Sequence, residues 1–241
     1  MSPQTAPAQL SIATTPSAPE RPAPWLRAAR QARLLAWASL FWMTLEGALG
    51  ILAGVEANSI SVLTWAASSA VEGMASAIVI WRFTGPRTLS EDSERRAQRW
   101  VAGSFFLLTP YFLFEAIDPR GHGTRPEATV LAIALTASSV VLMPLLAWAK
   151  FSLGRRLDSG ATSGEGMQNL LCAAQALAAL IAVVAAGAGI TVIDPLAAVL
   201  IAGIAAKEGR ELWRGEECGC HTIAGLARTS SNRCQDNSCT K

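Results

Sequence analysis

Two glutamates inside apolar stretches are the residues of this sequence whose chemistry most needs an explanation. Glu46 is the one ionisable residue of the apolar block 34–54, and Glu72 is the one in block 60–81. A charged side chain in the hydrocarbon of a bilayer costs at least about 2.5–3.5 kcal/mol. Each carboxyl group is therefore either protonated and hydrogen-bonded to a neighbouring helix, or part of a site for a cation or a proton.

Further polar residues follow at helical spacing. Ser68 precedes Glu72 by four residues, which places both on one helix face. Glu165, Gln168 and Cys172 follow one another at spacings of three and four residues, again on one face. Sulfur and carboxylate oxygen are ligands that Zn²⁺ and similar ions accept. Two helices carrying these faces could bind one metal ion between them.

Taken singly, the neutral residues have a simpler interpretation. Ser68 and Gln168 are of the small and polar types that hold membrane helices together. Cys172 alone behaves as a small buried apolar residue. Only the paired spacing on two helices favours a metal site.

The elements that must position these residues are six apolar blocks. Hydrophobic residues make up 51% of the 241 residues and charged ones 16%, against about 25% in ordinary soluble domains. Mean hydropathy is +0.32. The third of these blocks, residues 100–114, is short and broken by Pro110. With about 20 residues needed for each membrane span, the chain can supply six. The blocks are 34–54, 60–81, 100–114, 128–149, 166–190 and 192–206.

The distribution of basic residues tests this count. With the N-terminus in the cytoplasm, 18 of the 20 Lys and Arg residues fall on the cytoplasmic side, including Lys150 in the loop after the fourth block. Only Arg120 and Arg125 fall outside. This asymmetry is typical of multi-pass membrane proteins. The sequence therefore predicts an all-α polytopic membrane protein with six transmembrane helices and both termini in the cytoplasm.

Three regions follow from this pattern. Residues 1–33 are rich in Pro and Ala, so we expect a disordered tail. Residues 34–215 form the transmembrane domain. Residues 216–241 form a short cytoplasmic tail that could load a soft ion or be flexible without that role. The residues of this tail whose types can bind a metal are Cys218, Cys220, His221, Cys234 and Cys239.

Other function classes find little support. The net charge is only +2, and no basic cluster with interleaved aromatic residues occurs, so no nucleic acid is expected as a partner. Nothing resembles a nucleotide-binding loop or a catalytic triad, so we do not expect an enzyme. The charged stretch 85–99 is expected to be a solvated helix cap or a contact with lipid headgroups.

Three stretches together resemble the cation diffusion facilitator (cation efflux) family: GILAGVEANSISVLTWAASSAVEGMASAIVIW, GEGMQNLLCAAQ and VIDPLAAVLIAGIAAKEGRELWRGE. The resemblance covers roughly residues 34–217. It implies six transmembrane helices, a homodimer, and export of zinc or a related divalent ion in exchange for protons. The family's paired positions, [HD]-x-x-x-D on the second and fifth helices, fall on Ser68 and Glu72 and on Gln168 and Cys172.

The sequence departs from the family pattern at these positions. Of the four residues, Glu72 is a carboxylate and Cys172 is a thiol. The other two, Ser68 and Gln168, are neutral and are weak metal ligands. Glu46 and Glu165 could restore the missing charge. The family's usual cytoplasmic domain is expected to be absent, because 24 residues follow Glu217. We expect a divergent branch of the family.

We therefore expect a secondary transporter that exports a zinc-like divalent metal cation from the cytoplasm by proton exchange. The metal ion and protons are its substrates, and it lies as a multi-pass protein in a lipid bilayer, expected to be the bacterial inner membrane. The alternative is a non-transporting membrane scaffold or metal sensor with a transporter-like fold. The candidate metal-site residues are Glu72, Cys172, Ser68, Gln168, Glu165 and Glu46.

Overall fold

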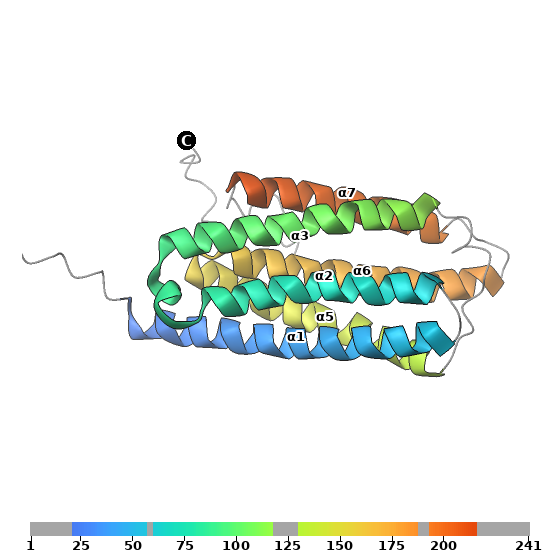
Figure 1. Ribbon diagram of the computed structural model, residues 1–241, viewed down its shortest axis with the longest axis horizontal. Helices are drawn as coiled ribbons and strands as arrows, with labels where there is room; N and C mark the ends of the chain where they lie inside the picture. The colour runs from blue at the N-terminus through green and yellow to red at the C-terminus, as the bar shows by residue number, and fades with distance from the viewer. Residues whose placement is uncertain (1–20, 57–59, 118–129, 188–192, 216–241) are drawn as a thin grey trace, which may run out of the picture.

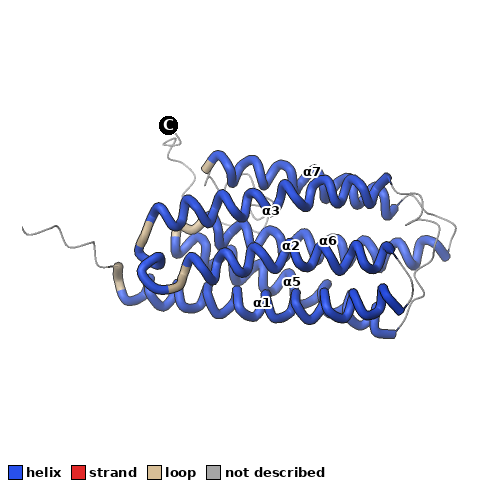
Figure 2. The backbone as a smooth tube through the Cα atoms, in the orientation of Figure 1, coloured by secondary structure: helices blue, strands red, loops and turns tan. Residues whose placement is uncertain are grey.

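The computed structural model describes residues 21–56, 60–117, 130–187 and 193–215. Within these ranges it contains six α-helices, one 3-10 helix and no strand, so the expected all-α class is confirmed (Figures 1 and 2). The helices lie side by side along the long axis of the bundle. In chain order they are α1 (Ala23–Glu56), α2 (Ile60–Arg82), the 3-10 helix η1 (Gly85–Leu89), α3 (Glu91–Ile117), α5 (Val130–Leu157), α6 (Gly160–Gly187) and α7 (Ile193–Arg214).

Helices α2 and α6 occupy the middle of the bundle. Helix α2 packs against α1, α3 and α6, and helix α6 packs against α5, α7, α2 and α3. The most extensive contacts join α1 to α2, α5 to α6, and α3 to α7. Polar residues on the facing sides of α2 and α6 are therefore enclosed by the other four helices.

The bundle is apolar outside and partly polar inside. Large apolar side chains such as Phe41 and Trp148 are about 70% exposed, whereas Glu46, Lys150 and Glu165 are at most 2% exposed. A protein in water shows the opposite arrangement, so this surface suits lipid. Within the part of the chain that the structure describes, two helical stretches are long and apolar enough to cross a membrane, Ala23–Leu52 in α1 and Ala137–Leu157 in α5.

Several helix ends differ from the sequence prediction. Helix α1 begins at Ala23, so residues 23–33, which we assigned to the disordered tail, are helical. Ala28, Ala29 and Ala32 of this segment are buried in the core, which explains the earlier start. Helix α3 continues through Pro110, which we expected to break it. Membrane helices tolerate proline because neighbouring groups can satisfy the freed backbone carbonyl.

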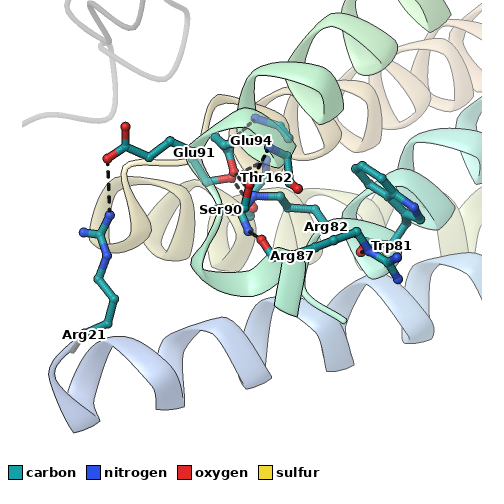
Figure 3. A network of polar contacts seen from close by, with 11 residues as sticks. Arg21, Trp81, Arg82, Arg87, Ser90, Glu91, Glu94 and Thr162 are labelled. Atoms are coloured by element: carbon teal, nitrogen blue, oxygen red, sulfur yellow. Dashed lines mark hydrogen bonds and ion pairs between the residues drawn. The ribbon is translucent and has the colours of Figure 1, made fainter. Parts of the chain in front are cut away.

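A polar network fixes one end of the bundle (Figure 3). Arg82, the last residue of α2, donates from Nε to Oε2 of Glu94 in the first turns of α3 at 2.6 Å. Glu94 Oε1 accepts hydrogen bonds from Ser159 Oγ at 2.9 Å and from the backbone N–H of Ala161 at 3.2 Å. The charged stretch that we expected to be solvated thus places one carboxylate between α2, α3 and the start of α6.

Candidate cation site

Glu72 of α2 faces Cys172 of α6, close enough for a hydrogen-bonding interaction between the carboxyl and thiol groups. Both side chains are buried, with 6% and 8% of their surface exposed. Helix α6 begins at Gly160 rather than at the predicted 166, so Cys172 lies about 18 Å along it at 1.5 Å per residue. The two residues that the sequence placed on separate helices do meet.

Glu46 of α1 supplies a second buried carboxyl group. Ser139 of α5 donates from Oγ to Glu46 Oε1 at 3.0 Å. Glu46 lies near enough for its charge to act on both Glu72 and Cys172. The first helix therefore contributes a second carboxyl group to the same interior region.

The neutral members of the predicted set lie in two places. Ser68 is buried one helical turn before Glu72. Gln168 is also buried, but its Nε2 donates to Ser104 Oγ of α3 at 2.6 Å. Gln168 therefore joins α6 to α3 through its amide nitrogen and can offer only its carbonyl oxygen to a cation.

Glu165 has a partner that the sequence prediction missed. Nζ of Lys150 lies 2.7 Å from Glu165 Oε1, and Lys150 is completely buried. We expected Lys150 in a cytoplasmic loop, and this is wrong: α5 continues to Leu157 and carries Lys150 into the bundle. A lysine directly after an uncharged block has the sequence pattern of a residue at the membrane surface.

The six predicted residues do not form a single ligand shell. In the described ranges, no group of three or more His, Cys, Asp and Glu residues comes together around one metal position. Glu165 is paired with Lys150, and Gln168 is hydrogen-bonded to Ser104. Glu72 and Cys172 face each other, and Glu46 lies near enough for its charge to act on both. The candidate ligands of the C-terminal tail, residues 218–239, lie outside the described residues.

Several buried side-chain oxygens of α1, α2 and α6 accept fewer hydrogen bonds than they could. Four such oxygens have no hydrogen-bond partner among the described residues: Glu46 Oε2, Glu72 Oε2, Glu165 Oε2 and Gln168 Oε1. A buried polar atom without a partner costs about 1–3 kcal/mol, and native proteins leave few of them. A carboxyl group can meet this need by taking up a proton or by contacting a cation, whereas the amide oxygen of Gln168 can only accept a hydrogen bond or contact a cation.

Comparisons with known proteins point to the same family as the sequence resemblance does. Residues 100–215 match the family model of the cation efflux transmembrane domain, which confirms the resemblance to the cation efflux family. The chain is also similar to Transmembrane protein 163 of Xenopus laevis, with 27% identity over 143 residues. That alignment covers 56% of this chain and 50% of the relative, so the chain matches about half of the relative's length.

The family-model match relates this part of the chain to a family of membrane-embedded cation transporters. The region matched by the family model contains α5, α6 and α7 and most of α3, so Cys172 lies inside it. Glu46 and Glu72 lie before it, on α1 and α2. Because the relative is from Xenopus laevis, the comparison gives no support to the bacterial inner membrane in particular.

Proposed function

We propose that this protein exports a divalent transition-metal cation of the zinc type from the cytoplasm in exchange for protons. The observation that supports this most is the buried Glu72 carboxyl group, which faces the Cys172 thiol and has one oxygen without a partner among the described residues. The transmembrane domain would have six spans with both termini in the cytoplasm, and would work as a homodimer as the family resemblance implies.

The chemistry follows from the residue types. Carboxylate oxygen and thiolate sulfur both bind Zn²⁺, and a thiol loses its proton when it binds a metal. Ser68 supplies a neutral oxygen one turn away, and Glu46 supplies further negative charge. When the metal leaves, a proton on Glu72 would replace it. Rocking of the bundle about a site near the middle of the membrane would expose the site to each side in turn.

The test is zinc uptake into everted membrane vesicles that carry a pH gradient, with the Glu72→Gln variant as the probe. Glutamine keeps the size and removes the charge and the proton site. We expect uptake to fall at least about tenfold, the factor produced by 1.4 kcal/mol of lost binding free energy. Glu91→Gln, on an exposed carboxylate with a side-chain exposure of 77%, should transport normally. Unchanged uptake in folded Glu72→Gln would refute the proposal.

A non-transporting metal sensor or scaffold is the second candidate. It is favoured by the lack of any group of three His, Cys, Asp or Glu residues in the described part of the chain. Titration of the purified protein with zinc, run beside the vesicle assay, separates the two candidates. Zinc binding without zinc uptake would identify the sensor, whereas binding with uptake identifies the exporter.

A further inference from the structure

Lys150 is held in the interior by three acceptors. Its Nζ donates to Ser39 Oγ of α1 at 2.6 Å, to Glu165 Oε1 at 2.7 Å and to Asn169 Oδ1 at 2.9 Å, the last two on α6. Asn169 in turn donates from Nδ2 to the sulfur of Met143 at 3.2 Å. An ammonium group has three N–H donors, and all of them are used. Lys150 therefore has one fixed position among α1, α5 and α6.

This position affects Glu165 directly. A divalent cation bound to Glu165 would lie within a few ångströms of the Lys150 ammonium, and like charges repel strongly at that separation in a low-dielectric interior. Removing the ammonium to make room would leave three buried acceptors without their donor, which is costly. Glu165 is therefore already neutralised and is a poor metal ligand while Lys150 is present.

The charge count of the interior leads to the same conclusion. Four glutamates of the described residues are buried. Glu208 lies near the end of α7, and the other three, Glu46, Glu72 and Glu165, lie on α1, α2 and α6. The charge of Lys150 acts on Glu72 as well as on Glu165. When all three carboxyl groups are ionised, Lys150 cancels one negative charge. The remaining two match a single divalent cation.

We propose that Lys150 is a built-in cation that limits the interior to one divalent ion, bound by Glu72 and Cys172, with the Glu46 carboxyl group balancing charge from nearby. Lys150 does this by excluding Glu165 from the ligand set. Both members of the ion pair are then positioning residues, which set the number of ions bound without touching the ion. This inference rests on the proposed function, because it assumes that the Glu72 region binds a cation.

The experiment measures zinc bound per chain by equilibrium dialysis of the full-length protein. The tail ligands are first removed in the background C218S, C220S, H221A, C234S and C239S, so that only the interior is counted. We expect about one zinc ion per chain in this background. Lys150→Met with Glu165→Gln, which removes both charges together, should still bind one. Lys150→Arg keeps the charge and should also bind one.

Lys150→Met alone is the gain-of-binding variant. It leaves Glu165 ionised without its counter-ion, so zinc bound should rise to about two per chain, or the affinity of the first ion should increase at least about tenfold. Size-exclusion elution shows whether each variant is folded. If Lys150→Met does not fold, the charge-matched double variant decides the question.

The outcomes separate the two proposals. If the double variant loses zinc binding as Glu72→Gln does, then Glu165 is a ligand and the inference is overturned while the proposed function stands. Unchanged zinc binding in folded Lys150→Met overturns it as well. If the background protein binds no zinc, or if Glu72→Gln binds it as well as the background does, the proposed function fails instead.

Discussion

The buried carboxyl groups of this chain differ in what neutralises them. Glu94 is paired with Arg82, and Glu165 with Lys150. Glu46 accepts a hydroxyl hydrogen bond from Ser139, and Glu72 faces a thiol. Among the described residues, Glu46 and Glu72 therefore have no ion-pair partner, in contrast to Glu94 and Glu165.

Glu208 gives a prediction about pH at the end of α7, beyond the sixth apolar block. Burial raises the pKa of this carboxyl group from 4.5 to about 7, with a smaller contribution from Glu211. The folded state then holds the proton more tightly than the unfolded state, so the free energy of unfolding falls as the pH rises from about 4.5 to about 7. The loss at neutral pH should be about 2–3 kcal/mol.

Thermal unfolding of the detergent-solubilised protein at pH 5 and pH 8 measures this effect. Glu208→Gln should unfold at nearly the same temperature at both values, whereas the unmodified chain should unfold at a lower temperature at pH 8. Glu91→Gln, at an exposed position, should retain the pH dependence of the unmodified chain. An equal pH dependence in Glu208→Gln would show that other groups cause it.

The sequence predicted part of the candidate site at the residue scale. Spacings of four residues placed Ser68 with Glu72 and Gln168 with Cys172, and the contact between Glu72 and Cys172 is present. The partners of Glu165 and Gln168 could not be predicted in this way. They come from α5 and α3, and helical spacing says which residues share a face but not which other helix meets that face.

At the scale of the elements, Glu94 determines how three helices meet. It receives Arg82 from the end of α2 and the backbone N–H of Ala161 from the first turn of α6, the helix that carries Cys172. Ser159 adds a cap, since its Oγ accepts the N–H of Thr162 at 3.2 Å. The start of α6 is thus fixed by side chains from outside its own helix.

We expect Glu94→Gln to lower the free energy of unfolding by about 2–4 kcal/mol, because it leaves the buried Arg82 guanidinium without its counter-ion. Asp92→Asn is the matched control in the same turn of α3, where Asp92 pairs with Arg95 at the surface. It should cost less than about 1 kcal/mol. Thermal or denaturant unfolding compares the two. Equal losses would mean that the buried network adds no stability of its own.

The apolar blocks predicted the number of α-helices found in the described residues and the start of α2 at Ile60, but not the starts of α1, α3 and α6 or the end of α5. Hydropathy locates the part of a helix that contacts lipid. The extensions at residues 91–99, 150–157 and 160–165 are polar or mixed, and their helical structure depends on contacts with other helices. Leu153, Leu157 and Ala161, for example, are buried in the core.

The whole molecule has its apolar side chains on the outside, and this predicts where charge is tolerated. Leu145 of α5 is 61% exposed within a stretch long enough to cross a membrane, and Leu89 of η1 is 50% exposed outside the apolar blocks. Leu145→Arg should cost about 2.5–3.5 kcal/mol in membrane insertion. Leu89→Arg should cost little.

The amount of folded protein extracted from membranes and eluting as a single species measures this difference. Leu145→Arg should reduce the yield strongly, whereas Leu89→Arg should match the unmodified chain. Equal yields would mean that the outer face of α5 does not contact lipid. The hydropathy pattern predicted this face in general terms. It could not predict the polar interior, which depends on how the six helices are arranged around one another.

The position of the Lys150–Glu165 pair along the chain has a consequence for biogenesis. The two residues are 15 apart, on consecutive helices joined by a tight turn in which Asp158 has a φ of 53°. A hairpin of α5 and α6 can enter the bilayer with its charges already matched, whereas each helix alone would carry an unmatched charge into lipid. Because α1 is synthesised earlier, Ser39 can be in place when the hairpin arrives. The order of synthesis therefore allows this buried charge to reach the interior of the bundle already paired.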